Sequence, residues 1–523
     1  MLPFRSDSPA DLAAARALFA RVGYTTAGVC NRLGLQKING LRTIGEGRTT
    51  ATEVADALDV VTRLFIDGGA VAAETVEALL PEPGLSALRR IGLIARHPRA
   101  PDHYAASVRL YPTEGLYIVS DLESVGPGLA DPEELEPADH VFSAITSLTG
   151  TFLSQVPRTP CDRFLELCAG TGIAALVASR FARQAWALDI TERSTRFAEF
   201  NARLNGIENV TALQGDLYAP VRGLTFDRIV AHPPYVPASE MKMVYRDGGE
   251  DGEQIVRRIF DELPDYLAAG GRFYLTCVAT DRKEAPLEQR IRGMVGEREA
   301  EFDVLVISHY SLPPAEYYGR LAASGRIGFD TAEQRIRLFR QLEAERIVYS
   351  SMVLQRHREP GARAPFTARR ERTEAAEWQE TEWLVDWLTR LADGDVLPDI
   401  LESRPRLLPH ARLQVTHRVE EGEWKVESSK VTVEYPFIRT VEMSVNAATL
   451  LTLCDGEHTL REILARLQSA GALSPEVPPE SFAEFIRELV TEGVLGVGGE
   501  PCHRAEGAAV GEVREETAPL EAG

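Results

Sequence analysis

The segment Phe164-Leu-Glu-Leu-Cys-Ala-Gly-Thr-Gly172 carries the strongest indication of fold in this chain. Its first part, residues 164–168, is short and apolar, which predicts a buried strand. The turn that follows contains Gly170 and Gly172, so that a ligand can approach the backbone closely. The Ala-rich residues 173–181 predict a helix whose first N–H groups would face polar ligand atoms. By itself, the segment also fits an ordinary strand-to-helix turn.

Alternating strand and helix patterns continue on both sides of this turn, over residues 141–358. Apolar runs predict further strands at 185–188, 210–213, 228–231, 273–278, 304–308 and 347–354. Helical spacing of apolar residues predicts helices that follow Thr191, that span 255–267 up to Gly270-Gly271, and that span 331–345. Strands that alternate with helices indicate an α/β domain with a parallel sheet.

Two acidic residues follow the second and third expected strands. Asp189 ends the second strand, where a carboxylate can accept hydrogen bonds from both hydroxyls of a ribose. Asp216 lies in Gly215-Asp-Leu217 after the third strand, where it can accept a hydrogen bond from an adenine amino group. Asp189 could instead be a charge at a helix N-terminus near Thr191, and Asp216 a turn residue. The turn and both acids, in this order in one α/β unit, favour an adenosine-containing cofactor.

These residues resemble the class I methyltransferases, whose loop usually reads Asp/Glu-x-Gly-x-Gly-x-Gly. Cys168 replaces the first glycine here, which argues against a dinucleotide site, and no lysine follows the loop as in a nucleoside triphosphate site. The resemblance implies a Rossmann-like, seven-stranded methyltransferase sheet and S-adenosyl-L-methionine as cofactor. It implies cofactor contacts from Glu166, Cys168, Ala169, Gly170, Gly172, Asp189, Ile190, Asp216, Leu217 and His232.

The motif His232-Pro-Pro-Tyr235 follows the fourth expected strand. It resembles the Asn/Asp/Ser-Pro-Pro-Tyr/Phe motif of methyltransferases that modify planar nitrogens, including release factor glutamine methyltransferases. In that family the first side chain and the next carbonyl, here His232 and Pro233, accept hydrogen bonds from the nitrogen and orient it toward the methyl group. The ring of Tyr235 would stack on the planar acceptor or contact the cationic methyl group. The two prolines would stiffen the loop, and Pro234 is a candidate substrate contact. The resemblance implies catalytic roles for His232, Pro233 and Tyr235.

His232 departs from the family motif, because a neutral imidazole has one acceptor nitrogen and no carbonyl. It could orient an acceptor or act as a general base for an amine, a hydroxyl or an acid. It could also contact the cofactor or be structural. Downstream, Tyr245, Arg246 and Asp247 are expected in a loop at the mouth of the site, either as substrate contacts or as part of a turn.

The flanking regions predict smaller domains. Residues 1–140 read as helices followed by a strand pair, which is similar to a winged helix. Residues 359–375 are rich in Arg, Pro and Ala and predict a linker, and residues 376–498 predict a second α+β, winged-helix-like domain. This domain is expected to begin with an amphipathic helix that carries Trp383 and Trp387, and Thr459-Leu-Arg-Glu462 is a capping-box pattern that predicts the start of a later helix. Residues 499–523 predict a disordered tail.

The composition limits the class of protein. The net charge is −21, which weighs against nucleic-acid binding, and the six cysteines contain no CxxC pair that would indicate a metal site. Neither a signal peptide nor a membrane span is evident, so we expect a cytoplasmic enzyme. The expected acceptor is a small molecule or a protein or peptide. An rRNA methyltransferase, suggested by six arginines between 356 and 372, and a non-catalytic cofactor-binding scaffold remain alternatives. The oligomeric state does not follow from the sequence.

Overall fold

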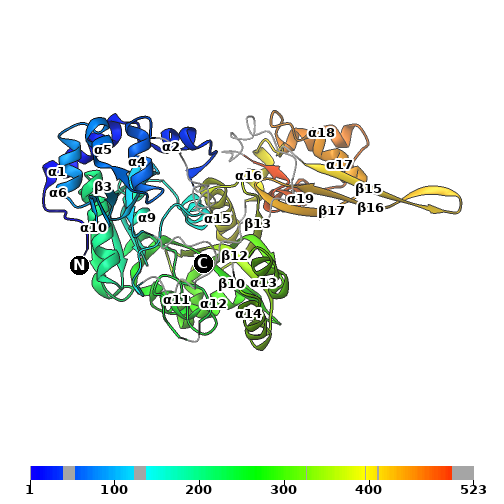
Figure 1. The fold of residues 1–523 in the computed structure, drawn as a ribbon. Helices are drawn as coiled ribbons and strands as arrows, with labels where there is room; N and C mark the ends of the chain where they lie inside the picture. The colour runs from blue at the N-terminus through cyan, green and yellow to red at the C-terminus, as the bar shows by residue number, and fades with distance from the viewer. Residues whose placement is uncertain are drawn as a thin grey trace.

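A computed structural model describes residues 2–38, 54–122, 137–238, 240–325, 327–394, 396–408 and 411–497. Its central feature is an 11-stranded sheet with the order β15-β16-β17-β13-β11-β12-β10-β9-β6-β7-β8 (Figure 1). The remaining strands form smaller sheets of two or three strands in the flanking regions.

Seven strands of this sheet correspond to those expected for the central region. They are β6 (Cys161–Leu167), β7 (Ala182–Asp189), β8 (Val210–Gln214), β9 (Phe226–Ala231), β10 (Leu267–Arg282), β11 (Phe302–Leu312) and β12 (Ala344–Arg356). The five strands from β8 to β10 are parallel, whereas β12 runs antiparallel to both β10 and β11. The predicted α/β class and the mainly parallel core are therefore confirmed.

The sheet does not end after seven strands, which corrects the expected size. Strand β13 (Thr367–Arg372) pairs in parallel with β11, and β17 (Phe437–Glu442), β16 (Glu423–Val433) and β15 (Arg412–Glu420) follow in antiparallel pairing. The physical reason is that β11 would otherwise expose the unpaired N–H and C=O groups of an edge strand. These groups are satisfied by strands distant in sequence.

The expected linker at 359–375 is wrong for its second half, because it contains β13. Its first half is also held in place. The buried carboxylate of Asp303 on β11 accepts hydrogen bonds from the Arg363 guanidinium and, at 3.0 Å, from the backbone N–H of Phe366. A charge-assisted pair around a buried carboxylate fixes this connection against the sheet.

Helices cover both faces of the central sheet because successive side chains of a strand point to opposite faces. Phe164 of β6 belongs to one apolar core, shared with α9 (Ile173–Ala178) and α10 (Glu192–Asn205). Leu165 and Leu167 belong to the core on the other face, shared with α11 (Gln254–Tyr266) and α12 (Leu287–Met294). The helices α13 (Pro314–Ala323) and α14 (Phe329–Gln341) form the insertion between β11 and β12.

Helix α11 ends at Tyr266, four residues before the expected stop at Gly270-Gly271. Leu267 already pairs with Phe226 of β9, and the register between β10 and β9 shifts before Arg272. Gly270 lies within this irregularity with φ +76°, a conformation that glycine adopts readily. The glycine pair therefore forms an irregular start of β10 and not a helix cap.

The N-terminal region is mainly helical, as expected. It contains α1 (Pro9–Arg21), α2 (Thr26–Leu33), α4 (Ala57–Phe65), β1 (Val71–Ala72), α5 (Ala73–Leu79), α6 (Gly84–Arg90), β2 (Ile94–His97), β3 (Ala100–Ala106), β4 (Arg109–Thr113) and β5 (Leu116–Ser120). Two short helices followed by a strand pair match the expected order, and the likeness to a winged helix stays a prediction.

This N-terminal region packs directly on α10 (Figure 1). The ring of Phe4 lies 4.8 Å from that of Phe197 and 4.4 Å from that of Phe200, measured between centroids. The side chain of Asn201 donates to the carbonyl of Val119 and accepts from its N–H. The N-terminal and central regions therefore share one continuous apolar core.

The C-terminal region begins with α15 (Trp378–Asp393), the expected tryptophan-bearing helix. It continues with α16 (Leu397–Glu402), β14 (Arg406–Leu407), the strands β15–β17, α17 (Val445–Leu450), α18 (Leu460–Ser469), α19 (Pro479–Thr491) and β18 (Leu495–Gly496). The predicted capping box of Thr459 and Glu462 is confirmed at α18. The hairpin β15–β16 projects away from the rest of the molecule (Figure 1). The expected disordered tail lies outside the described residues.

Within the described ranges, none of the helices is long and apolar enough to cross a membrane, and no group of three or more potential metal ligands occurs. The described cysteines are all free thiols.

Candidate active site

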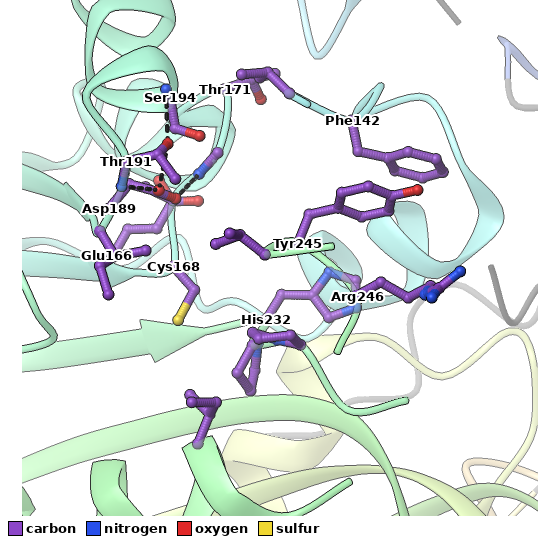
Figure 2. Close-up of a pocket in the computed structure, with 18 of the residues that line it drawn as sticks. Phe142, Glu166, Cys168, Thr171, Asp189, Thr191, Ser194, His232, Tyr245 and Arg246 are labelled. Carbon is purple, nitrogen blue, oxygen red and sulfur yellow. Dashed lines mark hydrogen bonds between the residues drawn. The ribbon is translucent and has the colours of Figure 1, made fainter. Parts of the chain in front are cut away.

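A cavity of about 430 Å³ lies at the carboxyl ends of β6, β7, β8 and β9. This is the end of a parallel sheet at which ligands bind in α/β folds. The expected site residues that line it are Glu166, Cys168, Ala169, Gly170, Asp189, Ile190, Asp216, Leu217, His232, Pro233, Pro234, Tyr235, Tyr245 and Arg246. Figure 2 shows Glu166, Cys168 and Asp189 on one side of the site and Phe142, His232, Tyr245 and Arg246 on the other. We call these the cofactor half and the acceptor half.

The turn after β6 shapes the cofactor half. Cys168 has φ +54° and Gly170 has φ +51°, both in the left-handed region. A Cβ atom added to Gly170 would meet no other atom within 4 Å, so the backbone borders open space here. The N–H of Gly170 donates to Oδ2 of Asp189 at 2.9 Å, which ties the turn to the end of β7. The turn therefore has the open backbone that its sequence predicts.

The conformation of Cys168 explains why the family usually has glycine at this position. An L-residue in the left-handed region is strained by about 1–2 kcal/mol, whereas glycine costs about 0.5–1 kcal/mol in lost chain entropy. We expect Cys168→Gly to raise the free energy of unfolding slightly, by about 0.5–1 kcal/mol. Urea denaturation of the variant and the wild type measures the difference.

The matched control for this substitution is Cys161→Gly in β6. Cys161 has no positive φ and pairs with Ala182, so glycine there should lower the free energy of unfolding. Equal destabilisation by both substitutions would contradict the strain at Cys168.

Glu166 lines the cavity, but its carboxylate is used within the protein. It accepts hydrogen bonds from the N–H groups of Ala174, at 3.2 Å, and Ala175, at 2.8 Å, in the first turn of α9. Burial raises the pKa of this carboxyl to about 8. Glu166 therefore joins β6 to the start of α9 and holds the turn between them.

Gly172 is not among the residues that line the cavity, and its expected cofactor contact stays a prediction. It precedes α9 with φ +76°, and a Cβ atom there would lie 2.8 Å from Cβ of Ala198 in α10. A side chain would push α9 and α10 apart. The glycine is needed for helix packing behind the turn.

Asp189 is held in a defined orientation at the end of β7. Its Oδ1 accepts from the N–H of Thr191 at 3.0 Å and from the Thr191 hydroxyl at 3.1 Å (Figure 2). Thr191 in turn caps α10 by accepting from the N–H of Ser194. Asp189 thus holds the turn at Gly170 and the start of α10 at Thr191, which agrees with a charge at a helix N-terminus. It also lines the cavity, where a ribose would lie.

Asp216 also lines the cavity, and its side chain is half exposed. Its Oδ2 accepts from the guanidinium of Arg258 at 2.7 Å. Arg258 is on α11 and lines the cavity, although nothing in the local sequence singled it out. Leu217, with φ +46°, places an apolar side chain next to this pair.

His232 lies in the acceptor half, directly after β9. Its ring stacks on that of Phe152 with 5.3 Å between centroids, and the ring of Tyr235 lies 5.9 Å away. The Nε2 atom is buried, and among the described residues it has no hydrogen-bond partner. Burial lowers the pKa of the imidazole to about 4. His232 is therefore a neutral side chain that can accept or donate one hydrogen bond at each nitrogen according to tautomer.

The outer wall of the acceptor half comes from two loops. Tyr245, after the motif, stacks on Phe142, with 5.0 Å between centroids and 11° between ring planes (Figure 2). The segment that carries Phe142 is bonded to the N-terminal region, because the N–H of Ala144 donates to the hydroxyl of Tyr111 at 2.6 Å. The N–H of Val244 donates to the carbonyl of Ala138, which joins the two loops. No motif in the sequence points to Phe142 or Phe152, so neither was expected in the site.

Asp247 is fully buried, so its expected substrate contact is wrong. Its carboxylate accepts from the N–H groups of Lys242 and Met243, both at 2.8 Å, and from Nε of Arg246 at 2.9 Å. Asp247 therefore stabilises the loop, as expected if it is part of a turn. Tyr245 and Arg246 border the cavity.

The cofactor half fits the adenosine cofactor that the sequence implies. It offers an open backbone at Gly170, a carboxylate at Asp189, a second at Asp216 and apolar side chains at Leu188 and Leu217. The cavity volume of about 430 Å³ lies in the range of small-molecule sites. Asp189 would hold the ribose, and Asp216 the adenine, of S-adenosylmethionine.

Comparison with known proteins shows which families this chain resembles. The family model of the methyltransferase small domain matches residues 138–305, and that of a domain of unknown function (DUF7059) matches residues 21–106. A putative protein N5-glutamine methyltransferase of Methanocaldococcus jannaschii is 33% identical over 147 residues, which cover 27% of this chain and 70% of the relative.

Two further relatives are matched over a smaller part of their length. A release factor glutamine methyltransferase of Thermodesulfovibrio yellowstonii is 33% identical over 22% of this chain and 46% of its own. A ribosomal protein uL3 glutamine methyltransferase of Bradyrhizobium diazoefficiens is 35% identical over 22% of this chain and 40% of its own. Among solved structures, a methyltransferase from Pyrococcus furiosus is 20% identical, with a TM-score of 0.27, over 41% of this chain and 84% of that one.

Proposed function

Because this chain belongs to the family of class I S-adenosylmethionine-dependent methyltransferases that includes the N5-glutamine methyltransferases, we propose that it methylates a side-chain amide nitrogen of a protein. The observation that carries the proposal is the position of His232-Pro-Pro-Tyr235, which lines the same cavity as the turn after β6. These relatives match between 22% and 27% of this chain, so the acceptor of the whole chain is our inference.

The neutral state of His232 favours an uncharged acceptor. With a pKa of about 4, the imidazole is a weak base that would take little of the proton of an ammonium or a hydroxyl. It can nevertheless accept a hydrogen bond from an N–H group, and its buried Nε2 lacks a partner among the described residues. Of the roles open from the sequence, orientation of the acceptor therefore fits best.

The residues of the acceptor half would act by holding the nitrogen in line. A primary amide has two N–H groups, which the imidazole of His232 and the carbonyl of Pro233 can accept. Both acceptors stabilise the positive charge that develops on nitrogen, and the ring of Tyr235 borders the same space. When bound, S-adenosylmethionine supplies the methyl: an N–C bond forms as the C–S bond breaks, the sulfur leaves as a neutral thioether, and the nitrogen releases one proton to water.

An RNA acceptor is less well supported. Of the arginines between 356 and 372, Arg356 pairs with Glu301, Arg363 with Asp303 and Arg369 with Asp281. Arg370 and Arg372 donate to backbone carbonyls. Five of the six guanidinium groups are thus engaged within the protein, whereas nucleic-acid affinity depends on cationic groups that reach phosphates.

The test is to incubate the chain with methyl-labelled S-adenosylmethionine and separate protein, RNA and small-molecule extracts. We expect label in the protein fraction. Acid hydrolysis should then release the label as methylamine, because hydrolysis breaks the amide C–N bond, whereas methylated lysine or arginine would keep the label on the amino acid. Label in RNA alone, or labelled protein that yields no methylamine, would refute the proposal. The control is the chain with Asp189→Ala, which should label the protein fraction far more weakly at the same cofactor concentration.

A further inference from the structure

Helix α8 (Ser147–Ser154) borders the acceptor half and ends beside the C-terminal region. Its Phe152 is 2% exposed and stacks on His232, with 24° between the ring planes. The hydroxyl of Tyr349 on β12 donates to the carbonyl of Leu148 near the start of the helix. The helix has 8 residues, and a helix of this length needs tertiary contacts to hold its position.

The C-terminal end of α8 is fastened by one buried amide. Gln155 follows the helix directly and is 3% exposed. Its Oε1 accepts from the hydroxyl of Thr381 on α15 at 3.0 Å, and its Nε2 donates to the carbonyl of Ala376 at 3.4 Å. Both ends of the side chain therefore bond to the C-terminal region.

A second contact ties the same end of α8 to β13, the strand at residues 367–372. The guanidinium of Arg372 donates to the hydroxyl of Ser154 at 3.4 Å. Phe152 and Gln155 are three residues apart, a separation that places side chains near each other on a helix. A shift at the Gln155 end would therefore move the ring that lies on His232.

We propose that the C-terminal region positions the acceptor half of the active site through α8, with Gln155 as the joint and Phe152 as the contact with His232. Both are positioning residues, since neither has to touch the acceptor. The proposal rests on the orienting role of His232 in the proposed function. It gives a catalytic purpose to a region that lies outside residues 138–305, which the methyltransferase family model matches.

The test is a double-mutant cycle of Gln155→Leu and Phe152→Leu. Its readout is the NMR signal of the His232 ring in the full-length chain with 13C-labelled histidine. The His232 ring signal is assigned by its loss in His232→Asn. We expect both single variants to shift this signal, and the double variant to shift it no further than Phe152→Leu alone, because Gln155 acts through Phe152. In Gln155→Leu, the affinity for S-adenosylmethionine should stay within about twofold of wild type, the usual margin for uncoupled sites.

The matched control is Gln184→Leu. Gln184 on β7 donates to the hydroxyl of Thr211 at 3.2 Å, within the sheet and away from the cavity lining. This variant should leave the His232 signal in place. If Gln155→Leu does not fold, Thr381→Val removes one of the two hydrogen bonds and replaces it in the cycle.

Three results would overturn the proposal. They are an unmoved His232 signal in Gln155→Leu, additive shifts in the double variant, and a loss of cofactor affinity in Gln155→Leu beyond that margin. The NMR readout needs no acceptor, so it stands or falls separately from amide methylation. Initial rates of protein labelling, measured with the same variants, then show whether the displaced ring slows transfer.

Discussion

An Asp189→Ala variant should bind S-adenosylmethionine at least about 100-fold more weakly than the wild-type chain, because hydrogen bonds to a charged group contribute about 1.5–3 kcal/mol each and 1.4 kcal/mol is tenfold in affinity. The carboxylate would lose its bonds to the ribose hydroxyls. The substitution would also release the N–H groups of Gly170 and Thr191, which donate to the two oxygens of the Asp189 carboxylate in the wild type. The substitution therefore removes a ligand contact and loosens the turn that shapes the cofactor half.

Isothermal titration calorimetry measures this loss directly. The matched control is Asp227→Ala, since Oδ2 of Asp227 also accepts from two backbone N–H groups, those of Asp162 and Arg163. Asp227 lies near the amino end of β9, at the opposite edge of the sheet from the cavity. The Asp227→Ala variant should have a lower free energy of unfolding than the wild type but the same affinity for the cofactor. Unchanged affinity in Asp189→Ala would rule out the ribose assignment.

The parts of the fold that the sequence predicts correctly are those written in local patterns. Each of the seven strands expected for the central region contains a short apolar run, and Asp189 and His232 follow such runs directly. Because carboxyl ends of parallel strands meet at one edge, residues far apart in sequence could be placed in one site. The cap at Thr191 and the capping box at Thr459 are equally local, and both are confirmed.

The parts that the sequence does not predict depend on pairing between distant segments. Strand β13 joins the sheet because β11 has a free edge, and the Arg-rich composition of that segment suggests a linker instead. Phe142 and Phe152 enter the site from segments that precede the sheet and contain no recognisable motif. Asp247 looks like an exposed turn acid, yet three donors surround it in the folded loop. In each case the position of the residue depends on contacts that form only in the folded chain.

Substitutions of His232 should separate an orienting role from a basic one. We expect His232→Ala to slow labelling of the protein fraction by about 100-fold, the order of the loss caused by a misplaced reacting group. Cofactor affinity should change little. His232→Asn should retain activity within about tenfold of wild type, since an amide oxygen can still accept the N–H but cannot act as a base. Equal loss in both variants would instead favour general-base catalysis.

The pH dependence provides an independent measurement of the same residue. Because the pKa of His232 is about 4, the imidazole stays neutral through the usual assay range, and its protonation should not limit kcat/KM near its ordinary pKa of 6.5. The sign for stability follows from the same shift. Between pH 6.5 and 4 the unfolded chain binds this proton and the folded chain does not, so acidification favours unfolding. Wild type should therefore lose thermal stability relative to His232→Asn as the pH falls through that window. The opposite result would be a change in kcat/KM near pH 6.5 that is absent in His232→Asn. It would mean that the imidazole has its ordinary pKa, so that it is not held neutral as a hydrogen-bond acceptor.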